Sequence, residues 1–154
     1  MRIVMVGFGK MGQEIARLSD QVKTIIDPHA SEADYTSISK ESILSSDVAI
    51  DFTHPSCILE NIKTYLDLGI PAVIGTTGWY EKIDEVKLWV GEKKGTLFYA
   101  PNFSVGVNLF FRLIRQAAQL INPFEDYGVS GFEAHHRFKA DSPSGTGEQC
   151  AQIL

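Results

Sequence analysis

The chain has 154 residues, of which 44% are hydrophobic and 21% are charged. These values are typical of a globular protein and exclude a wholly disordered chain, and the length fits one domain and at most part of a second. A formal net charge of -5 argues against a general nucleic-acid binder, and the apolar run at the N-terminus is too short for a secretory signal or a membrane span. We therefore expect a cytoplasmic protein with neither nucleic-acid nor membrane partners.

The first hundred residues alternate short apolar runs with amphipathic segments. Strands are expected at residues 2–6, 22–26 and 47–53, at the run that begins at Ile70, and at 95–99. Helices are expected at residues 10–19, 39–45, 55–68 and 80–90, with Pro55 in a permitted first-turn position. In the first helix, Met11, Ile15 and Leu18 recur at helical spacing. Such alternation predicts right-handed βαβ units, and hence an α/β fold with a Rossmann-type, doubly wound parallel sheet.

After Ala100 the alternation of short strands and helices ends. A long amphipathic helix is expected at 105–121, a strand at 126–135, and the start of a last helix at 147–154. The apolar side of the long helix is expected to carry Phe110, Phe111, Leu113, Ile114 and Ala117. We predict a dinucleotide-binding domain at 1–103 and, at 104–154, the beginning of a smaller α+β substrate-binding and oligomerisation domain. This second domain is expected to be incomplete, because the chain ends inside an apolar helix.

The stretch VMVGFGKMG places Gly7, Gly9 and Gly12 in a G-x-G-x-x-G pattern between an expected strand and an expected helix. The first glycine permits a tight turn, the second lets the backbone approach a pyrophosphate, and the third allows close helix–strand packing. The amino end of the helix offers N–H groups and a positive dipole end to phosphates. The pattern therefore predicts a dinucleotide site, although glycines also serve ordinary turns.

Asp27 stands at the end of the second expected strand, where a carboxylate hydrogen-bonds the adenosine ribose. A carboxylate there repels a 2′-phosphate, so NADH is expected to be preferred. Lys10 and His29 leave room for NADPH. The alternative is an exposed aspartate that only caps the turn at Pro28.

Two further loops follow apolar strands, where open α/β sheets bind ligands. They are GTTG, residues 75–78, and APNFS, residues 100–104. Their small residues would let the backbone approach a nicotinamide ring, and Asn102 could bond its carboxamide. The similar stretch DFTHP has a simpler explanation, since Asp51 and Thr53 could merely cap the helix that follows.

The segment EAHHRFKADSPSGTG gathers ionisable and anion-binding groups. Unperturbed histidine is the kind of side chain that titrates near neutrality, so His135 could deliver a proton, and Lys139 could supply a fixed positive charge or a second proton. Gly145 and Thr146 offer a backbone N–H and a hydroxyl to a carboxylate at the start of the last helix. No metal is expected, because His135 and His136 would point to opposite faces of a strand. The alternative is a histidine that is simply hydrogen-bonded in the core.

The motifs GFGKMG, DFT, GTTG, APNFSVGVN and E-x-HH-x-x-K-x-D-x-PSGT occur in this order and resemble the dihydrodipicolinate (4-hydroxy-tetrahydrodipicolinate) reductase family. The resemblance implies reduction of 4-hydroxy-tetrahydrodipicolinate with NADH or NADPH in diaminopimelate and lysine biosynthesis, by a homotetramer. It implies His135 and Lys139 as proton donors, and His136, Lys139, Gly145 and Thr146 as ligands of a small dicarboxylate substrate. For the cofactor it implies Gly7, Phe8, Gly9, Lys10, Met11, Gly12, Asp27, Gly75, Thr76, Thr77, Ala100, Pro101, Asn102 and Phe103. The chain departs from the family in Ser142, which replaces a commoner alanine, and in its shorter length.

Two other interpretations use the same scaffold. An amino-acid dehydrogenase acting on aspartate would share the nucleotide half, but would not be expected to carry the PSGT turn after paired histidines. A non-catalytic NADH-binding fragment is the other, and the intact His135 and Lys139 argue against it.

Overall fold

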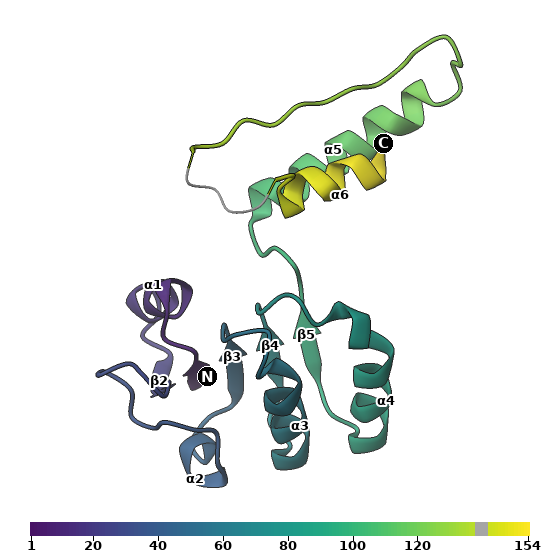
Figure 1. The fold of residues 1–154 in the computed structure, drawn as a ribbon. Helices are drawn as coiled ribbons and strands as arrows, with labels where there is room; N and C mark the ends of the chain where they lie inside the picture. The colour runs from purple at the N-terminus through teal and green to yellow at the C-terminus, as the bar shows by residue number, and fades with distance from the viewer. Residues whose placement is uncertain (138–141) are drawn as a thin grey trace. The chain divides into compact units, whose positions relative to one another are not determined.

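The computed structural model describes residues 1–137 and 142–154, which form two compact units, Met1–Pro101 and Asn102–Leu154 (Figure 1). The first unit contains a five-stranded parallel sheet with the strand order β2-β1-β3-β4-β5. Its strands are β1 (Ile3–Val6), β2 (Val22–Ile26), β3 (Val48–Asp51), β4 (Ala72–Ile74) and β5 (Leu97–Tyr99). The expected α/β, Rossmann-type sheet is confirmed. Because β1 pairs with both β2 and β3, the loops that follow β1 and β3 diverge to opposite sides, which opens a crevice between them.

Helices connect these strands. They are α1 (Lys10–Leu18), α2 (Lys40–Ile43), α3 (Ile58–Leu68), the short 3₁₀ turn η1 (Tyr80–Lys82) and α4 (Ile83–Lys93). The main core joins β1 to Ile43 of α2, Ile62 of α3 and Val86 of α4, so these helices share one face of the sheet. On the other face, Gly12 of α1 lies against Met5 of β1.

Helix α3 begins three residues later than expected. Residues 55–57 form a turn, in which the Cys57 N–H donates to the His54 carbonyl oxygen at 3.1 Å. Pro55 therefore precedes the helix, and Cys57 is its N-cap residue.

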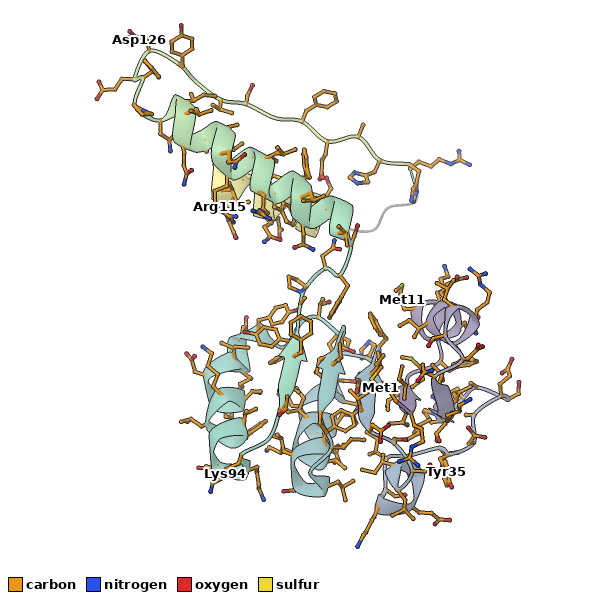
Figure 2. The ribbon with its side chains drawn as sticks, turned by 180° about the vertical axis from the view of Figure 1, so that it is seen from behind. Met1, Met11, Tyr35, Lys94, Arg115 and Asp126 are labelled. Carbon is orange, nitrogen blue, oxygen red and sulfur yellow. The ribbon has the colours of Figure 1, made fainter. Side chains whose placement is uncertain are left out.

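The apolar pattern of α1 does not correspond to a buried stripe. Met11, labelled in Figure 2, is 51% exposed and Leu18 is 73% exposed, whereas Gly12 is the buried residue of this helix. The reason is that α1 approaches β1 through a glycine, so that its backbone and not its large side chains makes the closest contact.

The second unit contains α5 (Val105–Ile121) and α6 (Gly145–Ile153), which pack side by side. Phe111 and Ala118, two turns apart, are the buried residues of α5, whereas Phe110 and Leu113 of the expected apolar side are exposed. The strand expected at 126–135 is wrong, because this stretch is irregular. A strand needs the backbone of a neighbouring strand, and no described residue of this unit is in one. Within residues 1–137 and 142–154, no helix has the length and apolar character required to cross a bilayer.

Candidate functional site

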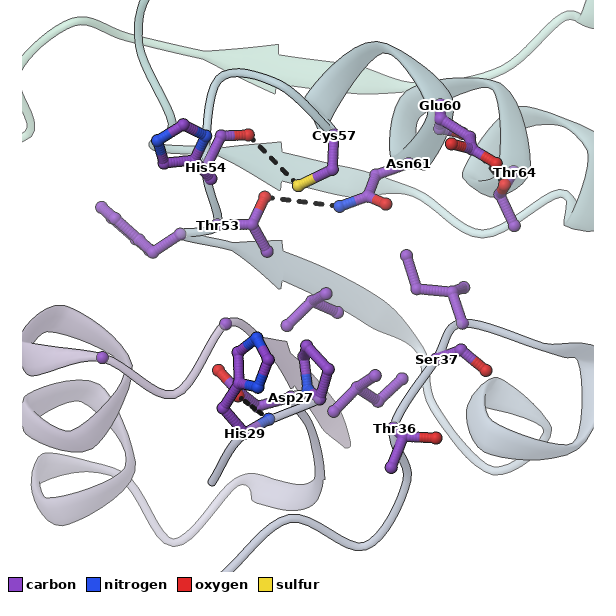
Figure 3. A pocket seen from close by; sticks show the side chains of 17 residues that line it. Asp27, His29, Thr36, Ser37, Thr53, His54, Cys57, Glu60, Asn61 and Thr64 are labelled. Atoms are coloured by element: carbon purple, nitrogen blue, oxygen red, sulfur yellow. Dashed lines mark hydrogen bonds between the residues drawn. The ribbon is translucent and has the colours of Figure 1, made fainter. Parts of the chain in front are cut away.

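An open cleft of about 610 Å³ lies where β1, β2 and β3 end, at the crevice expected from the strand order (Figure 3). We call it the switch-point cleft. Its lining residues are Val6, Gly7, Gly9, Ile26, Asp27, Pro28, His29, Thr36, Ser37, Ile38, Phe52, Thr53, His54, Cys57, Glu60, Asn61 and Thr64. Figure 3 shows Asp27 and His29 on one wall, and Thr53, Cys57 and Asn61 on the other.

The three glycines of the fingerprint have different geometries. Gly7 has a φ of +86°, and a Cβ there would overlap the carbonyl oxygen of Phe52. A Cβ on Gly12 would overlap the carbonyl oxygen of Gly7, so this glycine allows α1 to approach the turn. A Cβ on Gly9, in contrast, would meet no atom within 4 Å. Gly7 and Gly12 are thus required by the fold, whereas Gly9 borders open space at the amino end of α1.

Asp27 links the end of β2 to the glycine turn. Its carboxylate accepts N–H hydrogen bonds from Phe8 at 2.7 Å, from His29 at 2.8 Å and from Ala30 at 3.0 Å. Burial raises the pKa of this carboxyl group, but the three N–H donors lower it, and the net direction is downward. Asp27 is therefore an anion that the backbone holds in place. Since only one of the three bonds reaches Oδ2, this oxygen keeps acceptor capacity toward the cleft.

The loop after β4 is held from two sides. The Thr76 hydroxyl donates to Asp51 Oδ1 at 3.0 Å, and the Trp79 indole N–H donates to the Thr76 carbonyl oxygen at 2.8 Å. Thr76 is 5% exposed, so its hydroxyl is used inside the protein, whereas Thr77 is exposed. Gly75 packs on the ring of Phe52, which a Cβ would overlap. Gly75, Thr76 and Thr77 follow the end of β4 but are not among the lining residues of the switch-point cleft.

Residues 100–103 span the boundary between the two units. Asn102 uses its side-chain oxygen to accept from the Ser104 N–H at 2.8 Å, and its carbonyl oxygen accepts from the Asn108 amide at 2.9 Å. These bonds fix the approach to α5, whose N-cap is Ser104.

In the second unit, the histidine segment and the PSGT turn lie together. Glu133 accepts from the Ser144 N–H at 2.6 Å and from the Ser144 hydroxyl at 2.5 Å. The Ser144 Oγ in turn accepts from the Gly147 N–H at 2.9 Å, which caps α6. His135 Nδ1 lies 3.9 Å from Glu133 Oε2, and the two form an ion pair when the imidazole is protonated. An intrachain carboxylate thus occupies donors at the amino end of α6.

The other residues predicted to bind substrate differ in their surroundings. His136 is exposed, and Gly145 and Thr146 form the first turn of α6. Lys139 lies outside the described residues. Among residues 1–137 and 142–154, no three His, Cys, Asp or Glu side chains are arranged to hold a metal ion.

Sequence reasoning missed two groups of residues. The wall of the cleft formed by Cys57, Asn61 and Thr64 belongs to α3 and becomes visible only once β3 is known to pair with β1. The role of Glu133 was missed although it belongs to the histidine motif. Its partner Ser144 lies 11 residues later in the chain, a spacing with no helical or strand periodicity that would have indicated the contact.

A parallel sheet with a glycine turn after its first strand, an anion after its second and a cleft between them is typical of Rossmann-type folds that bind dinucleotides. Residues 1–103 match the family described as "Dihydrodipicolinate reductase, N-terminus", and residues 106–154 match "Dihydrodipicolinate reductase, C-terminus". The chain belongs to the dihydrodipicolinate reductase family.

Individual relatives support this assignment. The 4-hydroxy-tetrahydrodipicolinate reductases of Christiangramia forsetii and Mycolicibacterium smegmatis are each 37% identical over the whole chain, which spans 64% and 62% of their respective lengths. A dipicolinate-bound dihydrodipicolinate reductase from Paenisporosarcina sp. TG-14 superposes with a TM-score of 0.73 at 26% identity, over 99% of this chain and 64% of that protein. Aspartate dehydrogenase from Thermotoga maritima superposes over 75% of this chain and 52% of its own, with a TM-score of 0.56 at 12% identity, which shows a shared fold alone.

Proposed function

We propose that the protein containing this chain reduces 4-hydroxy-tetrahydrodipicolinate to tetrahydrodipicolinate with a nicotinamide cofactor, in diaminopimelate and lysine biosynthesis. Family membership over both matched segments supports the reaction. The observation that carries most weight is the pair of hydrogen bonds from Ser144, the N-cap of α6, to the Glu133 carboxylate, since they fix the turn whose next residues, Gly145 and Thr146, would bind the substrate carboxylates. We also propose the order of the domains: residues 1–103 would bind the nucleotide, and residues 104–154 would begin the substrate-binding domain.

The cofactor proposal rests on the switch-point cleft. Gly7, Gly9 and the amino end of α1 would hold the pyrophosphate, because α1 has no side-chain cap on its first N–H groups. Asp27 would accept from the ribose hydroxyls through Oδ2, and its negative charge disfavours a 2′-phosphate. We therefore propose NADH as the preferred cofactor, with NADPH accepted beside the exposed Lys10 and His29. The loops 75–77 and 100–103 would face the nicotinamide end.

The substrate proposal rests on the second unit. His136, Gly145 and Thr146, together with Lys139, would hold the two carboxylates. His135 would hold and deliver the proton, and its Nδ1 lies 3.9 Å from Glu133 Oε2. The bound nicotinamide supplies hydride. The chain contributes orientation and fixed charge, which turn a random encounter into an oriented reaction. We also infer a homotetramer and a cytoplasmic location, which sedimentation and cell fractionation would test.

A fluorescence titration of NADH and NADPH, with and without pyridine-2,6-dicarboxylate, tests both halves of the proposal. NADH should bind, and the dicarboxylate should tighten it. Thr146→Val is the matched control for the substrate half, because it removes one hydroxyl from α6 and changes nothing in the first unit. If NADH binds but the dicarboxylate has no effect, the chain is a nucleotide-binding fragment. If Lys139→Met in a catalytically active form of the protein leaves the rate of reduction unchanged, the proposed proton transfer is wrong.

A further inference from the structure

Asp51, the last residue of β3, is a carboxylate with no exposed surface. Its Oδ1 accepts from the Thr53 N–H at 3.0 Å, from the Thr53 hydroxyl at 2.7 Å and from the Thr76 hydroxyl at 3.0 Å. Its Oδ2 accepts from the Asn61 amide at 3.0 Å and from the Tyr65 hydroxyl at 2.6 Å. These donors are all neutral, and together they satisfy both oxygens.

Burying a carboxylate costs desolvation free energy, which well-formed hydrogen bonds must offset. A buried carboxylate is therefore a poor means of stabilising a fold. An aspartate that only capped the next helix would not need burial, and Asp51 does not cap α3, whose N-cap Cys57 receives no side-chain bond. Its donors come instead from three separate elements: the loop after β3, the loop after β4, and α3. This pattern indicates a junction between elements.

The two oxygens of this junction have different tasks. Oδ2 anchors the carboxylate to α3, which belongs to the core. Oδ1 holds the two loops that leave the sheet at its ligand-binding edge. The Thr53 N–H also donates to the Thr76 hydroxyl at 2.8 Å, and the Asn61 amide donates to the Thr53 hydroxyl at 3.3 Å, so the two loops are bonded to each other and the first of them also to α3.

The residues held by Oδ1 are next to the proposed cofactor. Thr53 and its neighbours Phe52 and His54 line the switch-point cleft. Thr76 belongs to the loop proposed to face the nicotinamide, and its carbonyl oxygen is fixed by Trp79. The carboxylate itself is sealed from the cleft.

We propose that Asp51 is a positioning residue for cofactor binding, which sets the loops after β3 and β4 in their binding geometry without touching the cofactor. This inference rests on the proposed NADH site. The competing explanation is that Asp51 only stabilises the packing of α3. The two explanations differ in which oxygen matters, since the loop donors of Thr53 and Thr76 bond Oδ1 and not Oδ2.

Three variants separate the explanations. Asp51→Asn disturbs both oxygens, Thr76→Val removes a donor to Oδ1, and Tyr65→Phe is the matched control that removes a donor to Oδ2 alone. The dissociation constant for NADH is measured by fluorescence, far below the urea midpoint of each variant, and the amide exchange rate of Thr53 is measured without nucleotide. Because a hydrogen bond to a charged group contributes about 1.5–3 kcal/mol, loss of the loop geometry should raise the constant about tenfold or more.

The expected result is weaker NADH binding and faster Thr53 exchange in Asp51→Asn and Thr76→Val. Tyr65→Phe should unfold at lower urea but bind NADH within about twofold of the parent, a shift of about 0.4 kcal/mol. The inference is overturned if Asp51→Asn binds NADH like the parent, or if Tyr65→Phe weakens binding equally. Should Asp51→Asn fail to fold, Thr76→Val decides by the same criteria. Failure of the parent to bind either nucleotide refutes the cofactor proposal and this inference with it, whereas parent-like binding by Asp51→Asn refutes the inference alone.

Discussion

Replacing Gly7 and Gly9 separately by alanine should give opposite outcomes, although the two residues belong to one motif. At Gly7 an alanine must adopt a φ of +86°, and its Cβ would overlap the Phe52 carbonyl oxygen and lie 2.7 Å from the carbonyl carbon. Left-handed backbone costs an L-residue about 1–2 kcal/mol, and overpacking adds about 1–3 kcal/mol. Gly7→Ala should therefore destabilise the fold by about 2–5 kcal/mol, a large part of a typical stability of about 5–15 kcal/mol.

Gly9 has a φ of -73° and a ψ of -162°, which alanine adopts freely, and a Cβ there meets no atom within 4 Å. Gly9→Ala should change the free energy of unfolding by less than about 0.5 kcal/mol. It should nevertheless raise the dissociation constant for NADH at least tenfold, about 1.4 kcal/mol, because the new methyl group stands where the pyrophosphate would approach.

Urea unfolding followed by far-UV circular dichroism measures the stability of both variants, and nucleotide fluorescence measures binding to the folded fraction. An unchanged urea midpoint for Gly7→Ala would refute the steric reasoning. Parent-like NADH binding by Gly9→Ala would mean that no pyrophosphate approaches this turn, and the cofactor would have to bind elsewhere.

Three other changes test separate parts of the structure. Asp27→Asn should reduce the preference for NADH over NADPH. Because the folded pKa of Asp27 is lowered, the carboxylate stabilises the fold above its ordinary pKa of 3.8 and loses this effect as the pH falls through the folded value, so urea midpoints of parent and variant should differ at pH 7 and converge in acid. Glu133→Ala should weaken pyridine-2,6-dicarboxylate binding about tenfold, since Ser144 loses both of its bonds to the carboxylate, and equal affinities would contradict this positioning. Trp79→Phe leaves the Thr76 carbonyl oxygen without its indole donor and should cost about 1–3 kcal/mol, which the urea midpoint would report.

The first unit, Met1–Pro101, could be predicted in detail because its signals are local. A turn with a φ of +86° admits glycine readily and other residues poorly. The glycine at position 7 therefore indicates a tight turn after β1. β2 was predicted with its observed bounds because its β-branched run ends at Asp27-Pro28, a strong breaker. The location of Asp27 beside the glycine turn then follows from its position at the end of that strand.

Other elements depended on partners that periodicity does not reveal. Met11 and Leu18 have the spacing of a core face, yet α1 packs through Gly12, because close approach of backbone to backbone leaves no room for a large side chain between them. The strand expected at 126–135 failed for a related reason. Alternation shows that a segment could pair, but pairing requires a neighbouring strand, and the described part of the second unit contains no strand.

The second unit shows why a specific motif can be recognised before the tasks of its residues are understood. The spacing E-x-HH-x-x-K-x-D-x-PSGT identified the family, but the sequence assigned its glutamate no task. In the structure Glu133 bonds Ser144, and the same carboxylate lies 3.9 Å from His135. Asp51 shows the same pattern in the first unit, where a residue first explained as a helix cap proves to join two loops and a helix. In both cases an acidic residue arranges the groups proposed to bind ligand. Variants of Glu133 and Asp51 should therefore change ligand affinity through their neighbours, and their effects should largely disappear when Ser144 or Thr76, respectively, has already been replaced.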